Sequence, residues 1–470
     1  MKRKILNKLL KWKTSSKKRY PVLLLGVRQC GKTHILKEFG NSYYENVVYV
    51  NFETNLLIHK EFEKDISPLK IISFLEMFFG VRIAAQKTLI IFDEIQSCER
   101  AVTSLKYFSE NASDFHVIGA GSLLGVAINR EKFSFPVGQV EILKMFPMDF
   151  EEFLFALGRE SYIKKIRECA EYFSPLPEAL HEEMLDLYRK YLVTGGMPAV
   201  VKEFVQSGTL TGVADFQQKI IDSYSADMAK YAEKSETVKI KACYDSIPAQ
   251  LAKENRKFQY KIVKRGGTAN IFGSALDWLI SAGVILKCTH LLEGFLPPLA
   301  YIDIPNFKIY MSDCGLLTLK SQMPQQMMLL KDEMTGGFKG SVAENFVAAS
   351  LVSMGHDLWY WTSGNTAEVD FVIIIEDKLI PIEVKSGSRV RSRSLSVYRE
   401  KYKPDFSIRL SEKNFGFENG IKSIPLYAVF VLEINPLNPL SQGDLDYTPL
   451  SKGVGLELVE MAGGIREIKE

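Results

Sequence analysis

The sequence has no cysteine pair at zinc-site spacing and no long apolar run. Its six cysteines, at positions 30, 98, 169, 243, 288 and 314, are spread over 470 residues. That spread indicates neither a zinc site nor a disulfide framework, and it suits a reducing compartment. No apolar stretch reaches the roughly 20 residues that span a bilayer. The basic N-terminus also lacks a continuous apolar segment and a small-residue cleavage site. We therefore expect a cytoplasmic protein with no signal peptide and no membrane partner.

Neither sign of charge dominates the sequence, because 59 Lys and Arg nearly balance 56 Asp and Glu and the net charge is only +3. The bases are unevenly distributed, however, and residues 1–20 hold nine Lys or Arg and no acid. Ile5, Leu9 and Trp12 stand at near-helical spacing among them, which predicts a basic amphipathic helix packed on the domain that follows. Contact with nucleic acid or a membrane is the alternative for this segment. The length of the chain predicts two to four domains.

Residues 26–33 follow the G-x-x-x-x-G-K-[ST] pattern of a P-loop, after an apolar strand at 22–25 and before a helix. Glycines at both ends let the backbone fold round a phosphate, and the helix offers its positive end. Lys32 is expected to reach the β- and γ-phosphates, and Thr33 to ligate Mg²⁺. The alternative is a glycine-rich turn in another α/β domain. The predicted ATP-binding residues are Gly26, Val27, Arg28, Gln29, Cys30, Gly31, Lys32 and Thr33.

Residues 88–96 form a second apolar segment, which ends in two carboxylates and fits a Walker B strand. Asp93 is expected to hold Mg²⁺, and Glu94 to orient and polarise the attacking water. A third strand, at 115–118, leads to Ser122, which is either a γ-phosphate sensor or a plain turn serine. Strands at 22–25, 47–51, 88–92 and 115–118 alternate with helical stretches. This order predicts an α/β fold, a parallel sheet with helices on both faces.

The middle of the chain reads as mostly helical to about residue 234. Beyond it, helices at 244–254, 260–265 and 270–282 and a strand at 283–288 favour a winged helix. A helix-turn-helix reads DNA or mediates protein contacts, and the sequence leaves both open.

The last third carries a second set of chemical groups. Asp370 and the Glu383-x-Lys385 pair fit the PD-(D/E)xK nuclease pattern on adjacent antiparallel strands. The two acids would converge on one Mg²⁺, and Lys385 would position or activate the attacking water. Glu344 would add a further metal-ligating acid from the preceding helix. The basic run of Arg389, Arg391, Arg393 and Arg399 follows. The alternative is a nuclease-like fold without activity.

These residues together resemble the prokaryotic AAA+ type ATPases that carry a C-terminal restriction-endonuclease-like domain. The shared motifs are residues 26–33, 92–96, 195–198 (Gly-Gly-Met-Pro), 313–316 (Asp-Cys-Gly-Leu), 340–345, 368–371 and 382–385. The division that we expect is a basic helix at 1–20, a P-loop AAA+ type ATPase domain at 21–155, a helical lid or connector at 156–235, a winged-helix-like domain at 236–325 and a restriction-endonuclease-like α/β domain at 326–470.

The resemblance implies ATP hydrolysis coupled to DNA binding or processing. The alternative is a regulatory protein that nucleotide switches, in which the nuclease-like fold only docks DNA or a protein. The sequence leaves open whether the protein forms a homo-oligomer. One departure stands out, because relatives carry Gly-Arg where this chain has Gly138-Gln139. If that arginine serves the γ-phosphate, Gln139 cannot replace its charge, and hydrolysis is slow or Arg100 or Arg130 serves instead.

Overall fold

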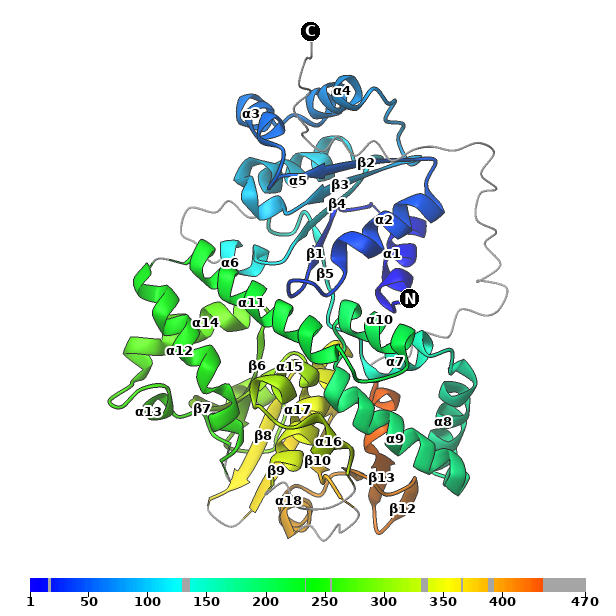
Figure 1. Ribbon diagram of the computed structural model, residues 1–470, viewed down its shortest axis with the longest axis vertical. Coiled ribbons are helices and arrows are strands. Elements are labelled where there is room, and N and C mark those ends of the chain that lie inside the picture. Colours follow the sequence, from blue (N-terminus) through cyan, green and yellow to red (C-terminus); the bar gives the residue numbers. More distant parts are fainter. Residues whose placement is uncertain are drawn as a thin grey trace. The chain divides into compact units, whose positions relative to one another are not determined.

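The computed structural model describes residues 1–15, 18–128, 136–232, 234–253, 256–330, 337–364, 367–387 and 393–433. They form two compact units, each of which is described by itself. Among the described residues, the smaller unit contains Leu6–Leu24 and Lys32–Leu143, and the larger unit contains Met1–Ile5, Leu25–Gly31 and residues 144–433. Figure 1 shows the elements coloured in sequence order, from blue at the N-terminus to orange near residue 430. In the described ranges, no helix is both long and apolar enough to cross a membrane.

The smaller unit is built on a five-stranded sheet in the order β2 (Asn46–Asn51), β3 (Thr88–Asp93), β4 (His116–Gly121), β1 (Val22–Leu25) and β5 (Glu141–Lys144). β2 pairs with β3, and β3 with β4, in parallel. All six residues of β3 are buried. That is why its sequence is a continuous apolar run and not an alternating one. The strands expected from the sequence are present, each within a few residues of its predicted bounds, whereas β5 was not anticipated.

In the part of the chain that the structure describes, six helices belong wholly or mainly to the smaller unit: α1 (Ile5–Thr14), α2 (Lys32–Tyr43), α3 (Leu56–Lys64), α4 (Pro68–Phe79), α5 (Glu99–Asn111) and α6 (Leu124–Ile128). A 3₁₀ turn at Ile95–Ser97 follows β3. In α1, Leu9 and Trp12 are buried, and the Trp12 ring lies 5.4 Å from that of His116 in β4. The apolar stripe of this helix therefore packs on the sheet, as the spacing of its residues predicts.

The larger unit begins with helices: α7 (Phe150–Ala156), α8 (Glu160–Tyr172), α9 (Glu178–Thr194), α10 (Pro198–Ser207), α11 (Val213–Tyr231), α12 (Lys234–Leu251), α13 (Tyr260–Val263) and α14 (Ala269–Ser281). α12 begins ten residues before the helix expected at 244–254, whose last residue lies outside the described ranges. α15 (Cys314–Lys320), α16 (Gln325–Leu329), α17 (Phe338–Ser353) and α18 (Arg393–Tyr402) come later, with 3₁₀ turns at Pro298–Tyr301 and Leu426–Leu432.

One eight-stranded sheet forms the core of the larger unit (Figure 1). Its strands are β6 (Ile285–Leu291), β7 (Ile302–Met311), β8 (Trp359–Ser363), β9 (Ala367–Ile375), β10 (Lys378–Val384), β11 (Ser407–Ser411), β12 (Gly416–Glu418) and β13 (Ile421–Pro425), in the order β12-β13-β11-β10-β9-β8-β6-β7. β6 pairs in parallel with β8, far along the chain. The hairpin β6–β7, which the sequence analysis put before a boundary at 325, therefore shares a sheet with the strands after it. A local pattern cannot show such a pairing, and the division at 325 stays a prediction.

Candidate functional site

The phosphate loop occupies residues 26–31 of the larger unit. Gln29 and Gly31 have φ angles of 65° and 98°, and the Cys30 amide donates to the Val27 carbonyl at 3.4 Å. These left-handed residues turn the backbone back on itself, as an anion cradle requires. A Cβ on Gly26 would lie 2.3 Å from the Met145 carbonyl oxygen, so no side chain fits there. The two positions of the motif thus require glycine for different reasons. Position 26 has no space for a side chain, and position 31 has a left-handed backbone.

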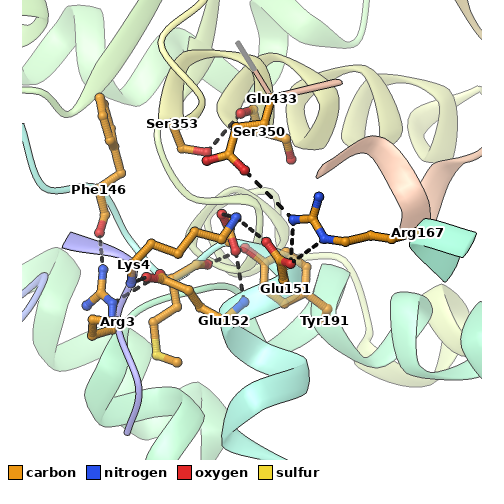
Figure 2. A network of polar contacts seen from close by, with 12 residues as sticks. Arg3, Lys4, Phe146, Glu151, Glu152, Arg167, Tyr191, Ser350, Ser353 and Glu433 are labelled. Carbon is orange, nitrogen blue, oxygen red and sulfur yellow. Dashed lines mark hydrogen bonds and ion pairs between the residues drawn. The ribbon is translucent and has the colours of Figure 1, made fainter. Parts of the chain in front are cut away.

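Arg3 supports this loop from the start of the chain. Its guanidinium donates to the Cys30 carbonyl at 2.8 Å, to the Phe146 carbonyl at 2.7 Å and to the Glu152 carboxylate at 3.0 Å. Figure 2 shows Arg3 reaching Phe146 and Glu152. Both members of the Arg3–Glu152 ion pair are buried. Sequence analysis missed this role, because Arg3 stands in a run of bases that reads as a solvated helix face.

Lys4 extends the same network (Figure 2). Its ammonium lies 2.7 Å from Asp149 and 2.5 Å from Glu151, the N-cap and an early residue of α7. Burial alone would lower the pKa of Lys4, but these carboxylates raise it above its ordinary value. Arg167 binds Glu151 from the other side at 2.6 Å. The first residues of the chain are therefore fixed to α7, where the helix dipole also favours the acids.

Helix α11 contacts the other side chains of the loop. Arg28 forms an ion pair with Asp227, and the Gln29 amide nitrogen donates to the Ser223 hydroxyl at 2.8 Å. The Tyr224 hydroxyl donates to the Arg28 carbonyl at 3.3 Å. The Arg-Gln pair at the centre of the motif is thus engaged by three residues within little more than one helical turn.

In the smaller unit, the two predicted Mg²⁺ ligands meet. The Thr33 hydroxyl donates to Asp93 Oδ2 at 2.6 Å, and the Tyr49 hydroxyl donates to the same oxygen at 2.8 Å. Asp93 is buried at the end of β3, and Lys32 is buried at the start of α2. A hydroxyl and a carboxylate are hard oxygen ligands of the kind that Mg²⁺ prefers. Thr33 and Asp93 therefore fit the ion.

Glu94 follows directly and has a left-handed φ of 47°. Its carboxylate accepts a hydrogen bond from the Gln96 amide at 2.6 Å. Burial raises the pKa of Glu94, while the Gln96 bond opposes the rise. Backbone strain and a raised pKa are both features of catalytic bases. Ser122 is buried just after β4, and its role as a sensor stays a prediction.

The region of the missing arginine is only partly described. Gln139 accepts a hydrogen bond from the Ser109 hydroxyl at 2.7 Å, so it is tied to α5. Arg100 donates to the Phe62 carbonyl at 2.7 Å. Arg130 lies outside the described residues. The bond of Arg100 does not show whether this residue replaces the absent arginine. Its role at the γ-phosphate stays a prediction.

The second set of predicted residues comes together in the larger unit. β9 and β10 are antiparallel, and their last register pair, Phe371 with Ile382, stands next to Asp370 and Glu383. Asp370 accepts from the Val384 amide at 2.8 Å, and Lys385 lies 2.5 Å from Glu383. Among the described residues, no group of three or more His, Cys, Asp or Glu is arranged to hold a metal ion. Arg389 and Arg391 are outside the described ranges.

Glu344 is bound by two cations and a hydroxyl, and its role as a metal ligand stays a prediction. It pairs with Arg256 and with Lys308 at 3.2 Å, and it accepts from the Tyr310 hydroxyl. Lys308 also lies 2.6 Å from Glu368, and its side chain is fully buried. Sequence analysis missed Lys308 and Tyr310, although a lysine amid the apolar residues of a strand was a usable signal. Arg256 and Lys308 therefore neutralise Glu344 and Glu368 within the protein. Two carboxylates that are already neutralised in this way have less need of a metal ion.

Comparison with known protein families finds matches to three segments of the chain. The AAA domain family matches residues 18–154. This segment is an AAA-type P-loop ATPase domain. The ATPase domain thus includes the phosphate loop, the β3 carboxylates and the five-stranded sheet. Two families that are described only as domains of unknown function, DUF8612 and DUF4143, match residues 185–326 and 339–429. One sheet contains strands from both of these matched segments.

Three solved proteins are similar to this chain at low sequence identity. The Walker-type ATPase PABY2304 of Pyrococcus abyssi is 15% identical, with a TM-score of 0.41, over 68% of this chain and 95% of the other. The Thermotoga maritima RuvB Holliday junction branch migration motor is 15% identical, with a TM-score of 0.29, over 61% and 89%. The Aeropyrum pernix ORC2 protein is 12% identical, with a TM-score of 0.31, over 73% and 90%. Similarity this low carries no argument about function. No curated protein matches the chain.

Proposed function

We propose that the chain binds ATP with Mg²⁺ at its ATPase domain, hydrolyses it, and uses the cycle to control DNA binding or processing by the C-terminal region. The observation that carries the proposal is the contact of Thr33 with Asp93 at 2.6 Å, next along the chain to the half-buried Glu94. In this reading the amides of residues 26–31 and Lys32 bind the phosphates. Thr33 and Asp93 would hold Mg²⁺, which supplies charge stabilisation to the phosphoryl group.

Glu94 is the residue that we assign to water activation. Its raised pKa makes it a better proton acceptor than an ordinary carboxylate, and the Gln96 bond fixes its direction. Glu94→Gln keeps the shape and removes the base, so it should bind ATP as the parent does and lose at least about 100-fold in turnover. Turnover at the parental rate would show that Glu94 is not the base. Glu99→Gln, which changes an acid in the first turn of α5, is the matched control.

For the C-terminal region we propose that Asp370, Glu383 and Lys385 form a nuclease-like site. Asp370 and Glu383 come from adjacent strands, and the ion pair with Glu383 holds Lys385 on the same face. Lys385→Ala should abolish Mg²⁺-dependent DNA cleavage and leave ATP turnover intact. Single-stranded, duplex and branched DNA are the substrates to compare. Cleavage by the variant at the parental rate would remove Lys385 from the mechanism.

A second function is favoured by the surroundings of Glu344. Its carboxylate is buried and bound to two cations and a hydroxyl, which is the arrangement of a structural ion network rather than of an open metal site. In that case the C-terminal region is a regulatory module that docks DNA or a protein without cutting. If the parent hydrolyses ATP but cleaves none of the three DNA substrates, this regulatory function is supported and the nuclease function is excluded.

A further inference from the structure

One residue of the phosphate loop has a strained backbone in the conformation that we propose binds nucleotide. Gln29 has a φ of 65°, in the left-handed region. A residue with a side chain occupies that region less readily than glycine, by about tenfold. Gln29 is exposed, so packing of its own side chain in a core does not offset this cost. Specific hydrogen bonds and ion pairs of Gln29 and its neighbours must therefore hold the loop in shape.

Helix α11 makes those contacts from a single face. Ser223 accepts a hydrogen bond from the Gln29 side chain at 2.8 Å, and Asp227, four residues on, pairs with Arg28. The Asp227 side chain is only 6% exposed, so this ion pair is shielded from solvent on one side. Tyr224 adds its bond to the Arg28 carbonyl. Both the side chains and the backbone of the strained segment are thus bound to α11.

We propose that Ser223 and Asp227 are positioning residues, which hold the phosphate loop in the conformation that accepts nucleotide. The proposal rests on the ATP binding proposed above and adds its dependence on the helical region. Neither residue touches the nucleotide in this account, since each acts through Arg28 or Gln29. α11 also packs against α10, α12 and α15. Because binding couplings are reciprocal, whatever moves α11 changes ATP affinity, and bound ATP stabilises α11 in place.

The test is the affinity of the full chain for ATP with Mg²⁺, measured by calorimetry. Asp227→Asn and Ser223→Ala should each weaken binding, and together by about tenfold. Asp222→Asn is the control, because Asp222 is exposed on the same helix and bonds only to Gln218 among the contacts described for it. It should leave the affinity unchanged. Parental affinity in the double variant would overturn the proposal.

Glycine at position 29 separates positioning from general damage to the fold. In a Gln29→Gly background the loop adopts the left-handed shape at no steric cost. The double change on α11 should then weaken ATP binding less than about twofold. An equal loss in both backgrounds would show that α11 acts on overall folding and not on the loop.

Failure of the proposed function gives a different result. If the parent chain itself shows no affinity for ATP, the assignment of the nucleotide site is wrong. If the parent binds ATP and the α11 variants bind it equally well, only the positioning role is wrong. Ser223→Ala removes one hydrogen bond and leaves the Arg28–Asp227 pair, so it provides a test even where the aspartate variant does not fold.

Discussion

The buried cation Lys308 offers the sharpest perturbation of the larger unit. Its side chain has no exposed surface and lies between Glu344 and Glu368, at 3.2 and 2.6 Å. Lys308→Met keeps the length of the side chain and removes the charge. Glu368 has a side chain that is 29% exposed and can turn to water, but Glu344, at 1%, cannot. The variant therefore leaves excess negative charge in the core.

The size of the effect follows from the partners that remain. Breaking a buried ion pair from one side costs about 3–5 kcal/mol. Glu344 keeps Arg256 and Tyr310 in the variant, so we expect the lower end, about 3 kcal/mol. Adding Glu344→Gln removes the uncompensated charge and should restore a large part of that loss. In urea, with a slope of about 3 kcal/mol per molar, the single variant should unfold about 1 M earlier.

Tryptophan fluorescence is a suitable assay, because Trp359 and Trp361 are buried in β8 of the same sheet. Lys378→Met is the matched control. Lys378 also pairs with an acid, Asp405, but both side chains are more than half exposed, so no shift in the urea midpoint is expected. A Lys308→Met midpoint equal to that of the parent would refute the reasoning. So would equal destabilisation in the single and double variants.

Three further results are expected. Burial and nearby cations lower the pKa of His116 to about 4, so the unfolded chain takes up its proton first. The free energy of unfolding should fall by up to about 3 kcal/mol as pH drops from 6.5 to 4, and His116→Gln should remove this slope in urea titrations. Burial raises the pKa of Glu94, so the acid limb of ATP turnover should lie above 4.5, and a limb at or below that value would contradict the base assignment. A Cβ at Gly196 would lie 1.9 Å from a backbone carbonyl, so Gly196→Ala should cost about 3 kcal/mol in thermal unfolding, whereas Gly273→Ala, which has open space, should not.

The sequence predicted well those parts of the fold that depend on local pattern. The strand bearing Asp93 is fully buried, so its apolar run was unambiguous. The turn at Gly26 and Gly31 was predictable because the P-loop pattern fixes the spacing of its glycines. The antiparallel strands with Asp370 and Glu383 also followed from short apolar runs with a turn between them.

What the sequence could not give was pairing over long distances. Lys308 and Glu344 are 36 residues apart and meet only because β7 and α17 pack together. Arg3 reaches Glu152 across 149 residues, and Arg28 reaches Asp227 across 199. Each side chain alone reads as a surface charge, since nothing local shows its partner. The support of the phosphate loop was therefore invisible, although the loop itself was plain.

The shared sheet is a further case. The β6–β7 hairpin reads as the wing of a winged helix when only its neighbours along the chain are considered. Its parallel pairing with β8 is set by an edge whose partner lies some 70 residues later, at Trp359 opposite Thr289. The sequence of a strand does not show which other strand will pair with its edge.

Calorimetric titration of ATP into the purified chain with Mg²⁺ tests the central claim most directly. The parent should bind, and Lys32→Ala should bind at least about tenfold more weakly, because it loses charge-assisted hydrogen bonds to the phosphates. Lys37→Ala, on the next turn of the same helix α2, should bind as the parent does. No heat of binding with the parent, or equal affinity in the parent and Lys32→Ala, would contradict the account.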